Sequence, residues 1–152
     1  MYLLQELLRE FFLLGINMLN VNNLICSLIA LQNFCKDIHY NAKGEAFYSM
    51  HLLADRVQDN LSDYIDRLKE VCILGNDEET LPSGEYLSRA TSLIPEIESS
   101  NKKNFDSLEN LIVNILTLIQ NIEPATKGED NLYGAIAEDL QNSLGLINRQ
   151  IK

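Results

Sequence analysis

The stretch NNLICSLIALQNFCKDIHY, residues 22–40, decides the fold class, because its apolar residues recur at steps of three and four. That spacing places them on one face of an α-helix that packs against other helices. The apolar positions are Leu24, Ile25, Leu28, Leu31, Phe34, Cys35 and Ile38. The sequence therefore predicts an amphipathic helix over 22–40, ended by a turn at 41–44 in which Gly44 takes a left-handed conformation.

Three further long helices follow the first one. The second is predicted over about 46–74 and ends at Gly75 and Asn76, a common C-terminal signal. A long connection over 76–100 holds a short helical piece at 84–91. The third and fourth helices are predicted over about 104–122 and 131–150, separated by Pro124 and Gly128. No segment shows the sustained alternation of a β-strand.

The lengths of the connections predict how these helices are arranged. A short, a long and a short connection require helices two and three to run parallel, which gives a bundle with one crossover connection. This connectivity is that of ferritin-like folds. The 152 residues are expected to form a single all-α domain over 1–152, with 1–20 as an extra N-terminal helical segment.

The N-terminal segment, MYLLQELLREFFLLGINMLN, is rich in Leu and Phe, but Glu6, Arg9 and Glu10 interrupt it. These charges disfavour both a signal peptide and a membrane span. We expect a helix that buries its apolar face against the domain or against a neighbouring subunit. The residues of that face are Leu3, Leu4, Leu7, Leu8, Phe11 and Phe12.

Composition narrows the possible partners. The chain has 12 Lys and Arg against 22 Asp and Glu, a net charge of −10. This argues against binding nucleic acid by neutralising phosphates, and against an anionic membrane surface. Three cysteines, an odd number, are expected to be reduced thiols of a cytoplasmic protein. Cys35 and Cys72 lie on apolar helical stripes and are expected to pack in the core.

Candidate metal ligands gather on the second helix. The only two histidines, His39 and His51, are twelve residues apart on either side of the turn. On a straight helix, Asp55, Asp66 and Glu70 would lie about 40°, 60° and 100° around the axis from His51. Nitrogen and oxygen donors together suit iron, manganese or zinc. The alternative is that these carboxylates are solvated and that His39 is a capping or surface residue.

The axial spacing points to a site between subunits. From His51 to Asp66 is roughly 22 Å along a straight helix, too far for one metal ion. The two halves meet only if two such helices pack antiparallel across a two-fold axis, as in an isologous dimer. His39, His51 and Asp55 of one chain would then face Asp66 and Glu70 of its partner.

The segment Asp37-Ile38-His39-Tyr40-Asn41-Ala42-Lys43-Gly44, followed by Phe47, His51 and Asp55, resembles the Dps family, the mini-ferritins of stressed bacteria. Asp66 and Glu70, Leu74-Gly75 and Gly84-Glu85-Tyr86-Leu87 continue that pattern. The resemblance covers about 22–152 and is densest over 37–91.

The resemblance implies a ferroxidase that oxidises Fe(II), preferentially with hydrogen peroxide, and stores the ferric mineral in a dodecamer built from two-fold dimers. Its catalytic and metal ligands would be His39, His51, Asp55, Asp66 and Glu70. Glu129, Asp130 and, more loosely, Glu138 resemble positions that line the iron entry pores. The alternative is that Glu129 and Asp130, near the start of a helix, stabilise its N-terminal dipole. The alternative function is a ferritin-like structural or DNA-protecting shell protein whose metal site is weak or unused.

The sequence departs from the family at two points. The family often has Trp after the first histidine and near the C-terminus, where this chain has Tyr40 and Gly145; it contains no Trp. Tyr40 is either an oxidisable neighbour of the site or a buried packing residue. Members that condense DNA carry a basic tail, whereas Arg9 is the only basic residue of the first 35. We therefore expect little or no DNA binding.

Overall fold

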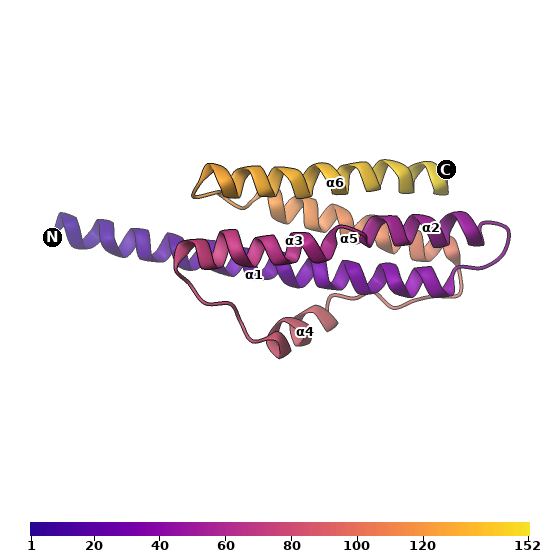
Figure 1. The fold of residues 1–152 in the computed structure, drawn as a ribbon, viewed down its shortest axis with the longest axis horizontal. Helices are drawn as coiled ribbons and strands as arrows, with labels where there is room; N and C mark the ends of the chain where they lie inside the picture. The colour runs from indigo at the N-terminus through magenta and orange to yellow at the C-terminus, as the bar shows by residue number, and fades with distance from the viewer.

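The structure, a computed structural model, describes all residues from 1 to 152 and consists of helices joined by turns (Figure 1). In chain order the elements are α1 (Tyr2–Asn41), α2 (Phe47–Gln58), α3 (Leu61–Arg67), a π-helical turn η1 (Leu68–Ile73), a 3-10 turn η2 (Leu74–Asn76), α4 (Ser83–Thr91), α5 (Asn101–Gln120) and α6 (Lys127–Ile151). The prediction of an all-α fold is confirmed.

Four legs form the bundle: α1, the run from α2 to η2, α5 and α6. The leg α2–η2 runs back along α1, and α5 and α6 form a second antiparallel pair (Figure 1). The leg α1 packs against both α2–η1 and α5, whereas α6 packs against α5, α2 and η1. The connection through α4 crosses α1, so α5 runs parallel to the second leg. This is the predicted ferritin-like crossover bundle with a short helix in its long connection.

The core is one continuous cluster of apolar side chains from all four legs. The face of α1 predicted over 22–40 is fully buried in it, together with matching faces of α5 and α6. Burial of each Leu, Ile or Phe side chain stabilises the fold by about 1.5–3 kcal/mol relative to exposure. The three cysteines are free and buried, as expected.

The second leg is not the straight helix that the sequence predicts. It breaks at Asp59 and Asn60, between α2 and α3, and then widens into the π-helical turn that contains Glu70. Asp and Asn are poor helix formers because their side chains compete for backbone hydrogen bonds. The side chain of Asn60 instead donates to Asp139 on α6, at 3.2 Å. The angles of Asp66 and Glu70 around a straight helix therefore do not apply.

The N-terminal segment is continuous with α1 and projects beyond the end of the bundle (Figure 1). Burial on α1 begins at Val21, and the large apolar residues before it are exposed or half-exposed. Of the two alternatives left open by the sequence, packing of this face against the chain's own domain is therefore not the one observed. By length and composition alone α1 could cross a membrane, which is weak evidence because its second half is core.

Candidate functional site

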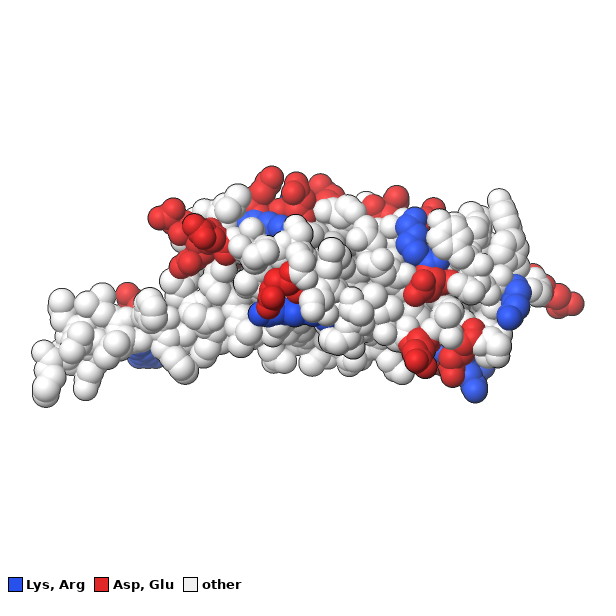
Figure 2. Space-filling model, turned by 90° about the horizontal axis from the view of Figure 1, so that it is seen from below, with Lys and Arg blue, Asp and Glu red and all other residues white.

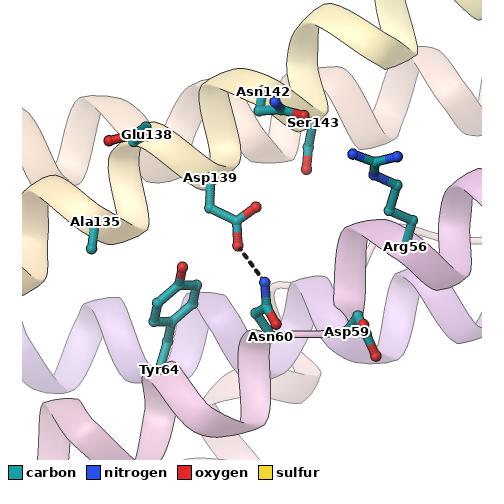
Figure 3. Close-up of a pocket in the computed structure, with 9 residues that line it drawn as sticks. All are labelled: Arg56, Asp59, Asn60, Tyr64, Ala135, Glu138, Asp139, Asn142 and Ser143. Carbon is teal, nitrogen blue, oxygen red and sulfur yellow. Dashed lines mark hydrogen bonds between the residues drawn. The ribbon is translucent and has the colours of Figure 1, made fainter.

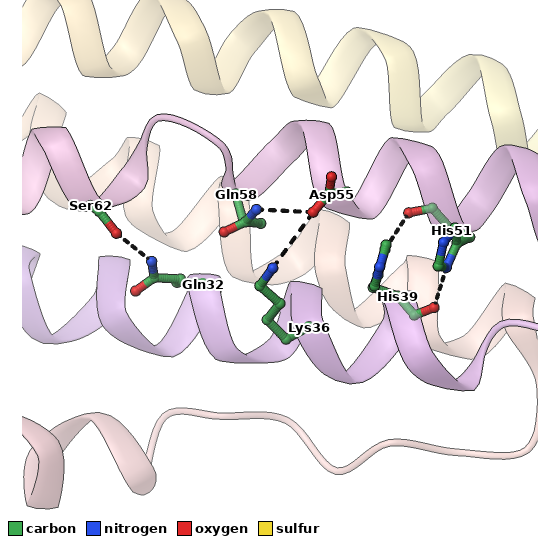
Figure 4. Close-up of polar contacts among 7 residues, drawn as sticks. All are labelled: Gln32, Lys36, His39, His51, Asp55, Gln58 and Ser62. Carbon is green, nitrogen blue, oxygen red and sulfur yellow. Dashed lines mark hydrogen bonds and ion pairs between the residues drawn. The ribbon is translucent and has the colours of Figure 1, made fainter.

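The turn between α1 and α2 places the two histidines against each other. Gly44 adopts φ +78°, which turns the chain back so that α2 lies along the end of α1. The rings of His39 and His51 stack with their centroids 3.6 Å apart and their planes 17° apart. Figure 4 shows the two rings side by side between the helices.

Each of these rings is held by the backbone of the other histidine. Nδ1 of His39 lies 2.9 Å from the carbonyl oxygen of His51, and Nδ1 of His51 lies 2.6 Å from the carbonyl oxygen of His39 (Figure 4). Because a carbonyl oxygen only accepts, each Nδ1 must donate its hydrogen. In the neutral imidazole this leaves a lone pair on Nε2, the tautomer that a metal ligand requires.

Asp55 lies one turn beyond His51 on α2 and is held by two neighbours. Lys36 Nζ is 3.6 Å from Asp55 Oδ1, and the Gln58 side chain donates to the same oxygen at 3.1 Å (Figure 4). Both members of the ion pair are about half-exposed. Such a pair is worth only about 0–1 kcal/mol, so a divalent cation can compete for this carboxylate.

Asp66 on α3 and Glu70 in η1 are exposed, and neither takes part in an ion pair of the chain. They do not meet the histidines: no group of three or more His, Cys, Asp or Glu in the chain is close enough to hold a metal ion. Asp66 and Glu70 are separated from His51 along the length of the second leg, as the sequence spacing predicts. The π-helical turn at Glu70 has no signal in the sequence, and such turns are frequent at functional sites.

Tyr40 follows His39 and contacts its ring edge-to-face, with centroids 5.1 Å apart. Its side chain is 75% exposed, so the expectation of a buried packing residue is wrong for the chain by itself. An exposed phenol against an imidazole lies where an oxidisable neighbour of the site would have to be.

Glu129 has a structural role at the start of α6, for which the spacing Thr126-x-x-Glu129 is a local signal in the sequence. It is 4% exposed and forms a capping box with Thr126 at the start of α6. Its carboxylate also accepts hydrogen bonds from the Asn76 side chain at 2.7 Å and from the backbone N–H of Ala125 at 2.6 Å. A carboxylate enclosed in this way cannot line a pore, so that expectation is wrong for Glu129. Asp130 is exposed, as is Glu138 further along α6.

A polar groove of about 450 Å³ lies between the second leg and α6 (Figure 3). Burial, followed by the nearby Asp139 carboxylate, raises the pKa of the Tyr64 hydroxyl, which therefore remains protonated. Arg56 is the only cationic side chain in the lining, which also includes the carboxylates of Asp59, Glu138 and Asp139 (Figure 3). The groove lies at the break in the second leg, and because the break itself was not predicted, the groove was not predicted either.

The crossover bundle with its short connecting helix places the chain in the ferritin-like class of folds. Among solved structures it is similar to Dps from Thermosynechococcus elongatus, with a TM-score of 0.83 over 93% of each chain and 18% sequence identity. The chain thus has a Dps-like ferritin fold. The sequence matches no protein-family model, and a comparison with curated proteins found no significant match. At 18% identity the similarity concerns the fold, so the function is argued from this chain's own residues.

Proposed function

We propose that this protein is a cytoplasmic ferroxidase that oxidises Fe(II) with hydrogen peroxide and stores the ferric product inside a shell of its own copies. The observation that carries the proposal is the histidine pair. His39 and His51 each present a free Nε2 lone pair from rings that the backbone already holds in place. Two such nitrogens side by side, with a carboxylate one turn away, are suited to a borderline cation such as Fe(II).

The ligand set is completed by a second copy of the chain. Within one chain, Asp66 and Glu70 lie too far along the second leg to reach the histidines. An antiparallel pair of second legs across a two-fold axis would bring Asp66 and Glu70 of one copy to the histidines of the other. Each dimer would then hold two equivalent sites. We propose that six such dimers form a dodecameric shell, as the likeness to the Dps fold suggests.

The proposed ligands would bind two Fe(II) ions, which are the substrate. Asp66 and Glu70 of one copy, with His39 of the other, would hold the first Fe(II). His51 and Asp55 would hold or relay the second, more weakly bound ion. Each Fe(II) gives one electron to hydrogen peroxide, its O–O bond breaks and two hydroxide ions form. Transfer of both electrons at one site limits release of hydroxyl radical, and the carboxylates favour the harder ferric product.

The direct test is anaerobic loading with Fe(II), followed by addition of peroxide and measurement of ferric absorbance. His51→Ala combined with Asp66→Ala should slow the absorbance change at least about tenfold, in line with the loss of metal ligands. Asp63→Ala is the matched control, because this exposed carboxylate on α3 forms its ion pair with Arg67, at 3.5 Å, and is not one of the proposed ligands. Unchanged kinetics in the double variant would remove these residues from the site.

Co-expression of the two single variants tests whether the site lies between copies. A dimer of one His51→Ala chain and one Asp66→Ala chain has one site with both residues intact and one site with neither. With random pairing about a quarter of all sites are intact, whereas neither variant has any intact site alone. If the site lay within one chain, co-expression would restore no ferroxidase activity, and that result would refute the intersubunit arrangement.

The second candidate function is a structural shell protein whose metal site is weak. The observation in its favour is Lys36, whose ammonium group pairs with Asp55 where a cation ligand is needed. The two functions differ in the stoichiometry of Fe(II) binding. Two Fe(II) bound per chain in anaerobic titration supports the ferroxidase, whereas one or none supports the shell.

Two further proposals follow from the distribution of charge. With a net charge of −10 per chain, a dodecamer would repel a polyanion, so we propose that it does not bind DNA. Figure 2 shows acidic side chains spread over the bundle and few basic ones. Exposed Asp130 and Glu138 are proposed to attract iron at the entry pores. Tight retention of DNA in a gel shift at low salt and neutral pH would contradict the proposal that the protein does not bind DNA.

A further inference from the structure

The apolar stripe by which α1 packs into the bundle continues past the end of the bundle. Val21, Ile25 and Leu28 of this stripe are buried in the core. The same steps of three and four lead back along the projecting segment through Leu4, Leu7, Phe11, Leu14 and Met18. A 3-4 repeat sustained over this length is typical of a seam between packed helices. Met18 packs against the core, and Leu14 lines a small cavity beside Cys72 and Tyr133. From Phe11 back to Leu4 the stripe is exposed.

The exposed apolar surface of this segment is as large as the largest apolar patch on a typical monomer. Six large side chains on or beside the stripe are each more than half exposed: Leu3 74%, Leu4 61%, Leu7 57%, Leu8 60%, Phe11 77% and Phe12 67%. At on the order of 100 Å² each they present roughly 600 Å², at the upper limit for a typical monomer. Leu14 and the edges of the stripe bring this near the roughly 800 Å² that each partner buries in a stable interface. On the face of the molecule that Figure 2 shows, most of the surface of this segment is uncharged.

Over the first half of the segment the opposite side is polar, whereas Leu13 and Ile16 lie on that side further along. Gln5, Glu6 and Arg9 line that side together with Tyr2. Helices that bind lipid surfaces carry Lys and Arg on the polar side, whereas this segment has one Arg and two Glu. A helix with one apolar face and a polar face exposed to water is instead suited to packing against another helix.

We propose that the covering helix is the same segment of a second copy, running antiparallel. A parallel copy laid on this face would collide with the second leg and α5, which cover α1 from Val21 onward. In an antiparallel pair the two bundles lie at opposite ends of the paired segments. Each projecting segment then lies against the other and ends where the partner's bundle begins. Such an isologous pair places Phe11, the middle of residues 2–20, near the two-fold axis.

This pairing is independent of the proposed iron site. Phe11 and His39 are 28 residues apart on one helix, or about 42 Å. The two interfaces therefore use opposite ends of α1, and loss of either leaves the other intact.

Cross-linking of the full chain tests the pairing. The three native cysteines are buried, so a cysteine placed on the free segment reacts selectively. We expect Phe11→Cys and Leu14→Cys to give covalent dimers with a short bis-maleimide at least about tenfold above Leu13→Cys, which lies on the side opposite the stripe. Adding Leu7→Glu should abolish the product. Equal yields at the three positions, or no product at either stripe position, would overturn the proposal.

Hydrogen exchange provides a second readout that needs no cysteine. An uncovered helix of this length frays, so protected amides over 3–16 require a partner. We expect protection in the wild type and in Gln5→Glu/Leu13→Glu, and its loss in Leu7→Glu/Phe11→Glu, which adds the same charge to the stripe. Fast exchange in the wild type overturns the pairing. Protection gained only with phosphatidylcholine–phosphatidylglycerol vesicles overturns it in favour of a lipid surface.

Discussion

The hydroxyl of Tyr86 donates a 2.7 Å hydrogen bond to Asn22 Oδ1, joining α4 to α1 across 64 residues of sequence. The same hydroxyl oxygen accepts from the backbone N–H of Leu81 at 3.2 Å. Tyr86 is 1% exposed and Asn22 9%. The contact fixes the long connection to the bundle at the point where α1 leaves it.

Tyr86→Phe removes this hydroxyl while keeping the ring in place. A buried amide oxygen and a backbone N–H lose their partner, and we expect the free energy of unfolding to fall by about 1–3 kcal/mol. Urea denaturation followed by circular dichroism measures the change. Tyr48→Phe is the control, because Tyr48 is 68% exposed and should change stability little.

Glu129→Gln tests the structural role assigned to this carboxylate. The charged acceptor receives hydrogen bonds from Asn76, Ala125 and Thr126, and an amide offers only one oxygen in its place. We expect a loss of about 1.5–3 kcal/mol of unfolding free energy, as for hydrogen bonds to charged groups. Asp130→Asn, at the exposed neighbour, is the matched control. Equal stability of the two variants would show that the buried cluster does not anchor α6.

Lys36→Met tests whether the ion pair with Asp55 competes with iron. Without the ammonium group the Asp55 carboxylate is free, so Fe(II) should bind more tightly, by up to about fivefold for a pair worth 0–1 kcal/mol. Anaerobic calorimetry with Fe(II) measures the affinity. Lys43→Met on the turn is the control, because the Lys43 side chain forms no ion pair. A weaker affinity in Lys36→Met would mean that Lys36 supports the site instead.

Alkaline pH should destabilise the fold. Burial raises the pKa of the Cys35 thiol far above its ordinary value of 9.0. Burial, and then the neighbouring Cys72, raise the pKa of the Tyr133 hydroxyl above 10.0. Below those ordinary values both groups are protonated in the folded and unfolded states, so their contribution to stability is fully present. Above them only the unfolded chain loses protons, and stability falls as pH rises.

The slope of that fall is about 1.4 kcal/mol per pH unit for each such proton. Urea denaturation from pH 7.5 to 10.5 measures it. Cys35→Ala lowers stability at every pH because it leaves a cavity, but it should also make the slope above pH 9 shallower. Parallel curves for the wild type and Cys35→Ala would contradict the assigned origin of the slope.

The long helices could be predicted from the sequence because their causes are local. The apolar spacing of 22–40 and of the stripes on α5 and α6 is determined by residues within a few turns of each other. The crossover also follows from the lengths of the connections. The proximity of His39 and His51 depends only on a short turn and a glycine that can adopt φ +78°.

The features that the sequence did not predict depend on contacts across the bundle. The break at Asn60 is accompanied by a hydrogen bond to Asp139, 79 residues away. Glu129 is enclosed by a bond from Asn76, 53 residues away. An acidic residue at a helix start is usually exposed, and only the packing of the second leg against α6 buries this one. The π-helical turn at Glu70 likewise has no local signature.

The reciprocal hydrogen bonds between His39 and His51 also determine whether the two side chains lose their rotational freedom on folding or on binding. Fixing a side chain at the moment of binding ordinarily costs about 0.5–1.5 kcal/mol. Here both rings lose their freedom when the chain folds, so in the proposed site a cation would meet donors that are already oriented. The converse is that the affinity of such a site would depend on the stiffness of a turn that the cation does not contact. A substitution at Gly44 would loosen both donors together.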